Sequence, residues 1–263
     1  MQERHKNRRQ YFEEQAYTTK KYVIPYIEKC IKLKSNNTVL EIGCGEGGNL
    51  KPFLDFGCRV VGIDLSEVKI NSGKKLFNNH QNKHKIEFIC DDIYKRPDIG
   101  KFDIVFLRDV IEHIPDQERF MNYLKNFLHP NSIVFFGFPP WQNPFGGHQQ
   151  VCHSKFLSKM PYFHLLPGKM YKYVLKKFGE SEGTINGLLE IKDTGISIER
   201  FERIIKENSY KINRKTLFLI NPNYEVKFNL KPKSQIRFIS SIPRIRNFLS
   251  TAAYYIISPS EVQ

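Results

Sequence analysis

The stretch Val39–Leu50, VLEIGCGEGGNL, is the most informative part of the chain. A short apolar run ends at Gly43, and Gly45, Gly47 and Gly48 follow. Glycines there let the backbone turn sharply and approach a ligand closely. A helix that begins after them offers free N–H groups to that ligand. The pattern therefore predicts a strand, a ligand-binding loop and a helix N-terminus in succession.

Acidic residues stand beside this loop and after the next two strand-like runs. Glu41 precedes the first glycine by two residues, Asp64 ends the run CRVVGID, and Asp91 and Asp92 end the run KIEFICDD. A carboxylate about twenty residues beyond a glycine loop can accept hydrogen bonds from both ribose hydroxyls of an adenosine ligand. We therefore expect an adenosine-containing ligand at this edge of the sheet.

Apolar, β-branched runs alternate with segments of helical period along the first half of the chain. Such alternation predicts an α/β fold with a Rossmann-like, doubly wound, mostly parallel sheet and helices on both faces. A lid inserted after the fifth strand and a C-terminal extension would complete it. The five predicted strands span residues 37–43, 58–66, 85–92, 101–109 and 131–138.

The ordered set of motifs resembles the class I S-adenosylmethionine-dependent methyltransferases. The chain has E-x-G-x-G-x-G, then an acid after the second strand, then another after the third. FDIVFLRDVIEHIPD looks like the family's fourth-strand motif, and LKNFLHPNSIVFFGFP looks like the helix that leads to its fifth strand. The resemblance covers residues 36–141, and more loosely the helix and strand at 197–221.

The resemblance implies a site for S-adenosyl-L-methionine. The glycine loop would wrap the methionine part and Glu41 would fix the loop, while Asp64 would hold the ribose. Asp92 and the Ile93 N–H would contact the adenine, and carbonyl groups at the end of the fourth strand would face the ammonium. The implied cofactor residues are Glu41, Gly43, Cys44, Gly45, Gly47, Asp64, Leu65, Asp92, Ile93, Leu107 and Arg108.

Two histidines are candidates for the general base that an alcohol-type nucleophile needs. His148 and His113 both follow the carboxyl ends of predicted strands, where open α/β sheets bind ligands. A packing role for His113 remains an alternative. We expect no metal site, because the histidines and the cysteine at 148, 152, 153 and 164 have no recognised ligand spacing.

The segment Gly137–Gln150, GFPPWQNPFGGHQQ, leaves the fifth strand at the same edge. We interpret it as the wall of the substrate site and the hinge of the lid, with Gly146 and Gly147 allowing the bend. The alternative is a packed corner without chemistry. The predicted substrate-binding residues are Trp141, Phe145 and His153. In similar proteins the segment before the first strand closes over the cofactor, so one of Tyr11, Phe12 and Tyr17 would cap the site. Ordinary helix packing of these residues is the alternative.

The expected organisation follows from these assignments. A helical N-terminal cap comes first, then the cofactor-binding core, a substrate lid, the last helix and strands of the core, and a basic extension with an amphipathic helix. That helix either packs on the domain or lies on a membrane surface. The five segments are 1–35, 36–141, 142–195, 196–230 and 231–263.

The formal charge of +14 is concentrated at the two ends. Residues 1–38 hold nine basic and four acidic groups, and residues 206–263 hold ten and three. Basic ends suit peripheral contact with an anionic membrane, or with nucleic acid. A charged N-terminal stretch and five scattered cysteines predict a cytoplasmic protein, peripheral at the inner membrane face if its ends bind lipid.

The preferred function is transfer of a methyl group from S-adenosylmethionine to an oxygen of a small-molecule, glycan or lipid-linked acceptor. Three alternatives remain. An RNA methyltransferase is suggested by the basic charge, although no RNA-binding module is readable. An NAD-dependent dehydrogenase shares the G-x-G-x-x-G fingerprint of residues 43–48. A methyltransferase-like protein that only binds its ligand is the third.

Overall fold

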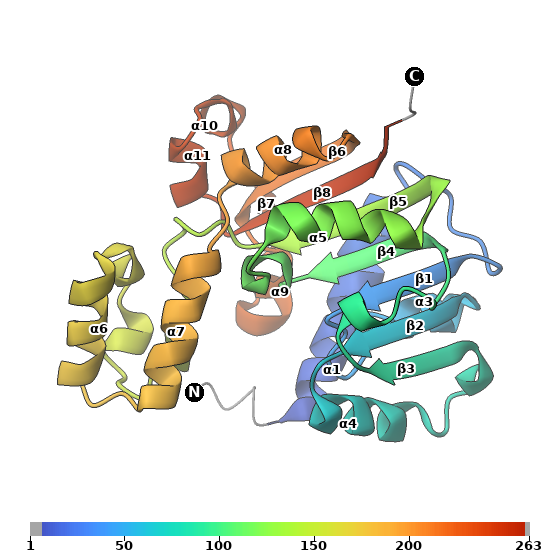
Figure 1. Cartoon of the computed structure of the whole chain (residues 1–263), viewed down its shortest axis with the longest axis horizontal. Helices are drawn as coiled ribbons and strands as arrows, with labels where there is room; N and C mark the ends of the chain where they lie inside the picture. The colour runs from blue at the N-terminus through green and yellow to red at the C-terminus, as the bar shows by residue number, and fades with distance from the viewer. Residues whose placement is uncertain (1–6, 261–263) are drawn as a thin grey trace.

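The computed structural model describes residues 7–260, and an eight-stranded sheet forms its centre (Figure 1). The strand order within these residues is β3-β2-β1-β4-β5-β8-β6-β7. The strands are β1 (Thr38–Ile42), β2 (Arg59–Asp64), β3 (Ile86–Cys90), β4 (Phe102–Arg108), β5 (Leu128–Phe138), β6 (Tyr210–Ile220), β7 (Lys233–Ser234) and β8 (Ala252–Pro259).

The first five strands are parallel, and each strand's register aligns the carboxyl ends at one edge. The chain order reverses between β1 and β4, which lie side by side in the sheet. Ligands of open α/β sheets bind outside the carboxyl ends of the strands at such a reversal. The predicted Rossmann-like, mostly parallel sheet is confirmed.

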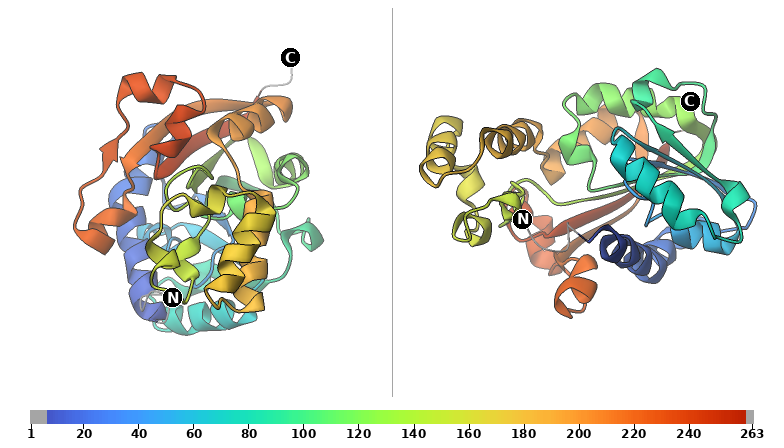
Figure 2. Two further views of the ribbon diagram at one scale, coloured as in Figure 1. Left: turned by 90° about the vertical axis from the view of Figure 1, so that its left-hand side faces the viewer. Right: turned by 90° about the horizontal axis from the view of Figure 1, so that it is seen from below.

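Helices cover both faces of the sheet and bury one apolar cluster on each side. One face packs against α5 (Gln117–Tyr123) and α8 (Ile198–Glu207), with Phe120 and Phe201 in the cluster. The other face packs against the following helices, which are best seen together in Figure 2: α1 (Arg8–Thr18), α2 (Ile24–Ile27), α3 (Lys51–Phe56) and α4 (Glu67–Phe77).

The predicted amphipathic helix near the C-terminus is wrong for most of its length. Only the short helix α11 (Ile245–Phe248) forms there, and residues 252–259 form β8. β8 runs antiparallel to both β5 and β6 and fills the gap between them. Its residues 252–257 are all buried, because both faces of a central strand are covered. Such a short apolar run cannot be assigned to strand or helix from periodicity alone.

The segment between β5 and α8 projects from one side of the sheet (Figure 1). It contains α6 (Gly168–Lys177) and α7 (Glu182–Thr194). The segment has its own apolar cluster, which includes Cys152, Leu157, Tyr171 and Leu188. A separate small core makes this segment a distinct structural unit beside the sheet.

Gly146 and Gly147 are closely packed, which contradicts their predicted role as a hinge. Both are buried, and neither has a positive φ. A Cβ on Gly146 would clash with the Trp141 carbonyl, and one on Gly147 would clash with the His164 side chain. These glycines therefore allow close contact of packed groups.

The remaining helices lie near the C-terminus. α9 (Asn223–Phe228) follows β6, and α10 (Arg237–Ser241) precedes α11. Within residues 7–260, none of the helices combines the length and the apolar composition that crossing a bilayer requires.

Candidate active site

The glycine loop after β1 turns back on the end of β2. Gly43, Gly45 and Gly47 all have positive φ, a conformation that residues with a Cβ rarely adopt. The N–H of Gly43 donates to the carbonyl of Ile63 at 2.8 Å. The N–H of Gly45 donates to the Asp64 carboxylate, also at 2.8 Å. Asp64, the acid after β2, therefore helps to hold the glycine loop in its conformation.

Glu41 is buried beneath this loop, with 1% of its surface exposed. One carboxylate oxygen accepts a 2.7 Å hydrogen bond from the Asn49 amide. The other oxygen has no partner among the described residues. Burial raises the pKa of Glu41 to about 8, while the Asn49 bond and the nearby Arg108 charge act in the opposite direction. The side chain thus links β1 to the loop, as expected of a loop-fixing residue.

Arg108 is buried at the end of β4, and its guanidinium joins three other elements. It donates to Asn49 at 3.0 Å, to Thr19 at 3.4 Å and to Asn223 of α9. The sequence assigned a role only to the backbone carbonyl here. The side chain has a separate structural function, because it ties the glycine loop to the N-terminal and C-terminal helices.

A cavity of about 290 Å³ lies at the carboxyl ends of β1, β2 and β3. Its lining includes five of the predicted cofactor residues, from three different segments: Gly43, Asp64, Leu65, Asp92 and Ile93. His113, Val110 and Phe120 close its other side. Ligand cavities of this kind, mostly apolar with a few convergent polar groups, are the usual form of small-molecule sites.

The other six predicted cofactor residues do not line this cavity. Glu41 and Cys44 are buried behind the loop. Gly47 packs beside Phe88, where a Cβ would lie 2.8 Å from the ring. A Cβ on Gly45 would meet Lys69 Cδ at 3.8 Å and no other atom of the described residues within 4 Å. The loop therefore has space for a ligand beside Gly45. Leu107 and Arg108 are buried within β4.

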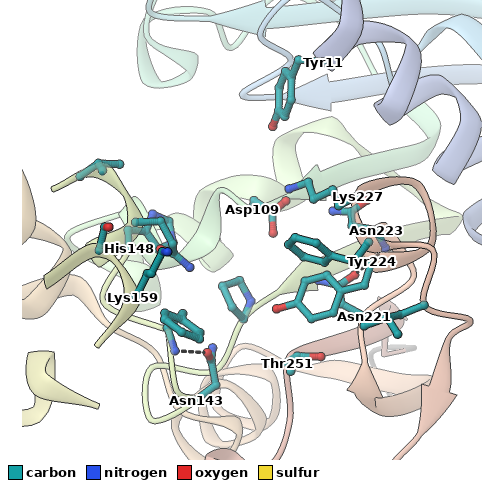
Figure 3. Close-up of a pocket in the computed structure, with 17 residues that line it drawn as sticks. Tyr11, Asp109, Asn143, His148, Lys159, Asn221, Asn223, Tyr224, Lys227 and Thr251 are labelled. Atoms are coloured by element: carbon teal, nitrogen blue, oxygen red, sulfur yellow. Dashed lines mark hydrogen bonds between the residues drawn. The ribbon is translucent and has the colours of Figure 1, made fainter. Parts of the chain in front are cut away.

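A larger cavity of about 590 Å³ lies between the sheet edge, the inserted segment and α9. Figure 3 shows Tyr11 on one side, His148 and Lys159 on another, and Asn221 to Lys227 opposite them. Of the three candidate capping aromatics, Tyr11 lines this cavity. Phe12 instead packs on Phe77 with ring centroids 5.4 Å apart, and Tyr17 is exposed.

The predicted substrate residues have different positions in the structure. Phe145 lines the larger cavity together with His148. Trp141 lines neither cavity, because its ring packs edge-on against His164 at 4.7 Å. His153 also lines neither cavity, and its exposed ring lies 3.3 Å from the Glu180 carboxylate. The wall role of Trp141 and the substrate contact of His153 are therefore not supported by these positions.

The two candidate catalytic histidines lie side by side, one on each cavity. His113 lines the smaller cavity and His148 the larger one, and their ring centroids are 5.0 Å apart. Desolvation of its ring by the surrounding protein lowers the pKa of His113, although the residue as a whole is exposed. The carboxylate of Glu112 lies 3.9 Å from Nε2 of His148. A titratable pair that contacts two cavities is a candidate site for a reaction between two ligands.

Several residues of this region escaped the sequence interpretation. Glu112 was passed over, although its position next to His113 after the fourth strand was the available signal. Asp109 has a positive φ of 55° and lines the larger cavity. Asn143, Asn223 and Tyr224 line it as well. No local pattern distinguished them, because they reach the cavity only through the packing of distant segments.

The family model described as "Methyltransferase domain" matches residues 11–155, which is more than half of the chain. A "Ubiquinone biosynthesis O-methyltransferase" of Coxiella burnetii is 34% identical over 116 residues, 43% of this chain and 47% of that protein. A protein with the same description from Pelagibacter ubique is 32% identical over 121 residues, 44% and 50% of the two chains. The chain spans about half the length of these curated relatives.

Solved structures share the fold at low sequence identity. The plantazolicin methyltransferase BpumL, in complex with SAH, has a TM-score of 0.54 at 14% identity, covering 96% of this chain and 84% of that one. The magnesium protoporphyrin IX methyltransferase of Synechocystis PCC 6803 has a TM-score of 0.52 at 16% identity, covering 93% and 84%. The predicted resemblance is confirmed: the chain belongs to the family of class I S-adenosylmethionine-dependent methyltransferases.

Proposed function

We propose that this chain binds S-adenosylmethionine in the smaller cavity and transfers its methyl group to a hydroxyl oxygen of an acceptor in the larger one. The observation that carries the proposal is that His113 lines the smaller cavity and His148 the larger one, while their rings are only 5.0 Å apart. A methyl donor in one cavity and an acceptor in the other would meet there. The matched ubiquinone-biosynthesis O-methyltransferases support oxygen as the acceptor atom.

The residues around the smaller cavity fit this cofactor. Asp64 keeps carboxylate lone pairs for ribose hydroxyls beside the bonds it accepts from Gly45 and Ser66. Asp92 and Ile93 line this cavity, and in this proposal they would contact the adenine. The unpartnered oxygen of Glu41 is a second acceptor behind the loop. When bound, S-adenosylmethionine would supply a methyl group already activated on a sulfonium.

His148 is the proposed proton acceptor, with His113 as the second candidate. The acceptor oxygen would form its new bond to carbon as the carbon–sulfur bond breaks, and the bonding pair would stay on sulfur. The hydroxyl proton must then leave, and an imidazole at neutral pH can take it. His148 lines the larger cavity directly, where the acceptor hydroxyl would lie.

The acceptor is proposed to be a small molecule, a glycan or a lipid-linked intermediate. The larger cavity combines amide groups with aromatic and apolar side chains, and its volume suits a small organic molecule. Phe228 and Leu230 extend its lining to the protein surface, where 55% and 46% of their areas are exposed. These two residues would accommodate an apolar tail on the acceptor.

The segment 230–249 is the proposed contact with an anionic membrane surface. Ile236, Phe238 and Ile245 are 63%, 74% and 50% exposed. Exposed lysines and arginines accompany them at positions 231, 233, 237 and 244. Apolar side chains among basic groups suit the interface of an anionic bilayer. The same stretch of chain lines the larger cavity at Leu230, so this contact would place the cavity near lipid.

Calorimetry with S-adenosylmethionine and with its demethylated product tests the cofactor assignment. We expect both to bind the full chain with micromolar affinity or better, and NAD to give no heat. If neither of the two compounds bound, the proposal would be overturned. Binding of NAD alone would instead select the dehydrogenase.

Sedimentation with vesicles tests the membrane contact. The chain should sediment with anionic vesicles at low salt and remain in solution with neutral ones, because the basic groups are screened by salt. Changing both Ile236 and Phe238 to Ser should reduce binding. Val68→Ser is the matched control, since Val68 is also exposed, at 62%, but lies on α4. Equal binding by both variants would contradict this surface.

A further inference from the structure

Glu112, His113 and His148 form a compact group of donor atoms beside the two cavities. One carboxylate oxygen and one ring nitrogen from each histidine all lie within 4.8 Å of one another. Oε1 of Glu112 lies 3.9 Å from Nε2 of His148, which is longer than a hydrogen bond.

The Glu112 carboxylate is the unusual member of this group. It is only 3% exposed, and neither of its oxygens has a hydrogen-bond partner among the described residues. A buried carboxylate without hydrogen bonds is costly, and such groups in proteins are normally paired or coordinate a metal. The side chain therefore has two oxygens free to accept bonds from a ligand.

The backbone that carries this carboxylate is held firmly. The Thr194 hydroxyl at the end of α7 donates to the Glu112 carbonyl at 2.6 Å. The buried Gln117 amide donates to the carbonyls of Ile111 and Thr194 at 3.0 and 2.7 Å. The turn Ile111–His113 is thus attached both to α5 and to the inserted segment, which fixes Glu112 and His113 before any ligand binds.

His148 approaches the group from the other side. It has a left-handed backbone with φ of 54°, which is unusual for a residue with a Cβ. This conformation ends the tightly packed turn at Gly146 and Gly147. The glycines and the strained residue together place one imidazole against the Glu112 carboxylate. Strain of this kind is commonly found at functional sites.

We propose that Glu112, His113 and His148 are the ligands of a divalent transition-metal ion. Two imidazoles and one carboxylate on one side of an ion are a recurrent set for zinc and ferrous iron, with other positions left open. Metal bonds of about 2.1 Å require the donors to move slightly closer than they are here. Imidazole ligands favour such ions over Mg²⁺ or Ca²⁺, which prefer oxygen.

The open positions of this ion would face both cavities, because His113 lines one and His148 the other. A hydroxyl oxygen bound to the ion would lose its proton more readily, as metal-bound water does, and the proton would pass to solvent water in the larger cavity. This role rests on the proposed function and replaces proton acceptance by His148 with binding of the acceptor oxygen. The site differs from the histidine and cysteine set considered from the sequence, with which it shares only His148.

Titration of the purified, chelator-treated chain with Co²⁺, followed by visible absorption, tests the site. We expect one Co²⁺ per chain, displaced by Zn²⁺ but unaffected by excess Mg²⁺. His113→Ala and His148→Ala should each weaken binding by at least about tenfold. His153→Ala is the matched control, because His153 also lies beside a carboxylate, that of Glu180, but outside the group. It should bind Co²⁺ like the original chain.

Glu112→Gln is the third variant, and circular dichroism should check its folding because the residue is buried. His113 is exposed, so its variant keeps the test decisive if Glu112→Gln does not fold. Absence of Co²⁺ binding, or equal binding by His113→Ala and His153→Ala, would overturn the proposal.

Calorimetry with S-adenosylmethionine on the metal-free chain separates the two proposals. Metal binding without cofactor binding would support the metal site and remove its role in methyl transfer. Cofactor binding without metal binding would overturn the metal site and leave His148 as proton acceptor.

Discussion

The Asp64 carboxylate accepts a hydrogen bond from the N–H of Gly45 at 2.8 Å, which joins the end of β2 to the loop after β1. Its second oxygen accepts from the N–H of Ser66, also at 2.8 Å, at the start of α4. The one carboxylate therefore shapes two walls of the smaller cavity. A substitution there should affect the ligand and the loop together.

Asp64→Asn should weaken binding of S-adenosylmethionine about ten- to a hundredfold, because hydrogen bonds to charged groups contribute about 1.5–3 kcal/mol. Calorimetry measures this change. Asp91→Asn is the matched control, since Asp91 lines the same cavity but accepts a hydrogen bond from the adjacent Asp92 N–H. Equal affinities of the two variants would remove Asp64 from the proposed ribose contact.

Gly43→Ala should destabilise the fold more than Gly100→Ala does. Both glycines have positive φ, 72° and 97°, so both variants incur a backbone cost of about 1–2 kcal/mol. A Cβ on Gly43 would also lie 2.5 Å from Val110, whereas a Cβ on Gly100 meets nothing within 4 Å. Overpacking should add about 1–3 kcal/mol, measurable by urea denaturation. Equal losses of stability in the two variants would mean that the loop moves away from Val110 without a further cost in free energy.

Lowering the pH from about 6.5 to about 4 should remove the contribution that His164 makes to stability. Burial lowers the pKa of His164 to about 4 from 6.5, and Nε2 is committed to the Trp141 carbonyl at 2.8 Å. The other ring nitrogen faces the Gln149 amide, and the Lys192 ammonium is nearby. The His164 ring is therefore protonated more readily in the unfolded chain than in the folded one. Its contribution to the stability of the fold is complete above pH 6.5 and is lost as the pH falls.

Denaturation at pH 7.5 and pH 5 measures this effect. His164→Gln should reduce the difference between the two conditions by roughly 2 kcal/mol, since each pKa unit corresponds to about 1.4 kcal/mol. The ion pair of Glu199 with Arg246 does not interfere, because the pKa of Glu199 is lowered to about 2 and its contribution is lost only in more acidic solution. An unchanged pH dependence would exclude His164 as the titrating group.

Ile256→Ala should cost about 2–5 kcal/mol of stability, as expected when a buried side chain leaves a cavity. Ile256 is fully buried in β8, between β5 and β6. Ile245→Ala is the control, because Ile245 is 50% exposed and should change stability by less than about 0.5 kcal/mol. Similar losses of stability in the two variants would contradict the burial of Ile256 in β8. They are the result expected if both residues lay on one face of a helix.

The sequence predicted the cofactor side of the molecule more fully than the acceptor side. Residues 38–92 contain one strand followed by the glycine loop and two strands followed by acids, and parallel pairing brings the carboxyl ends of these strands to one edge. Asp64 and Asp92 therefore reach one cavity by local patterns alone. Trp141 shows the limit, since its aromatic character suggested a substrate wall while its ring is used for packing against His164.

The sequence by itself determined the α/β class, the first five strands and the acids at their ends, because each depends on residues close together in the chain. Only the tertiary structure placed β8 between β5 and β6, where pairing across more than a hundred residues outweighs a helical period. Only it brought Glu112 and His113 to His148, and Tyr11 to the cavity lined by α9. These contacts join distant segments through packing, which no local pattern of residues encodes.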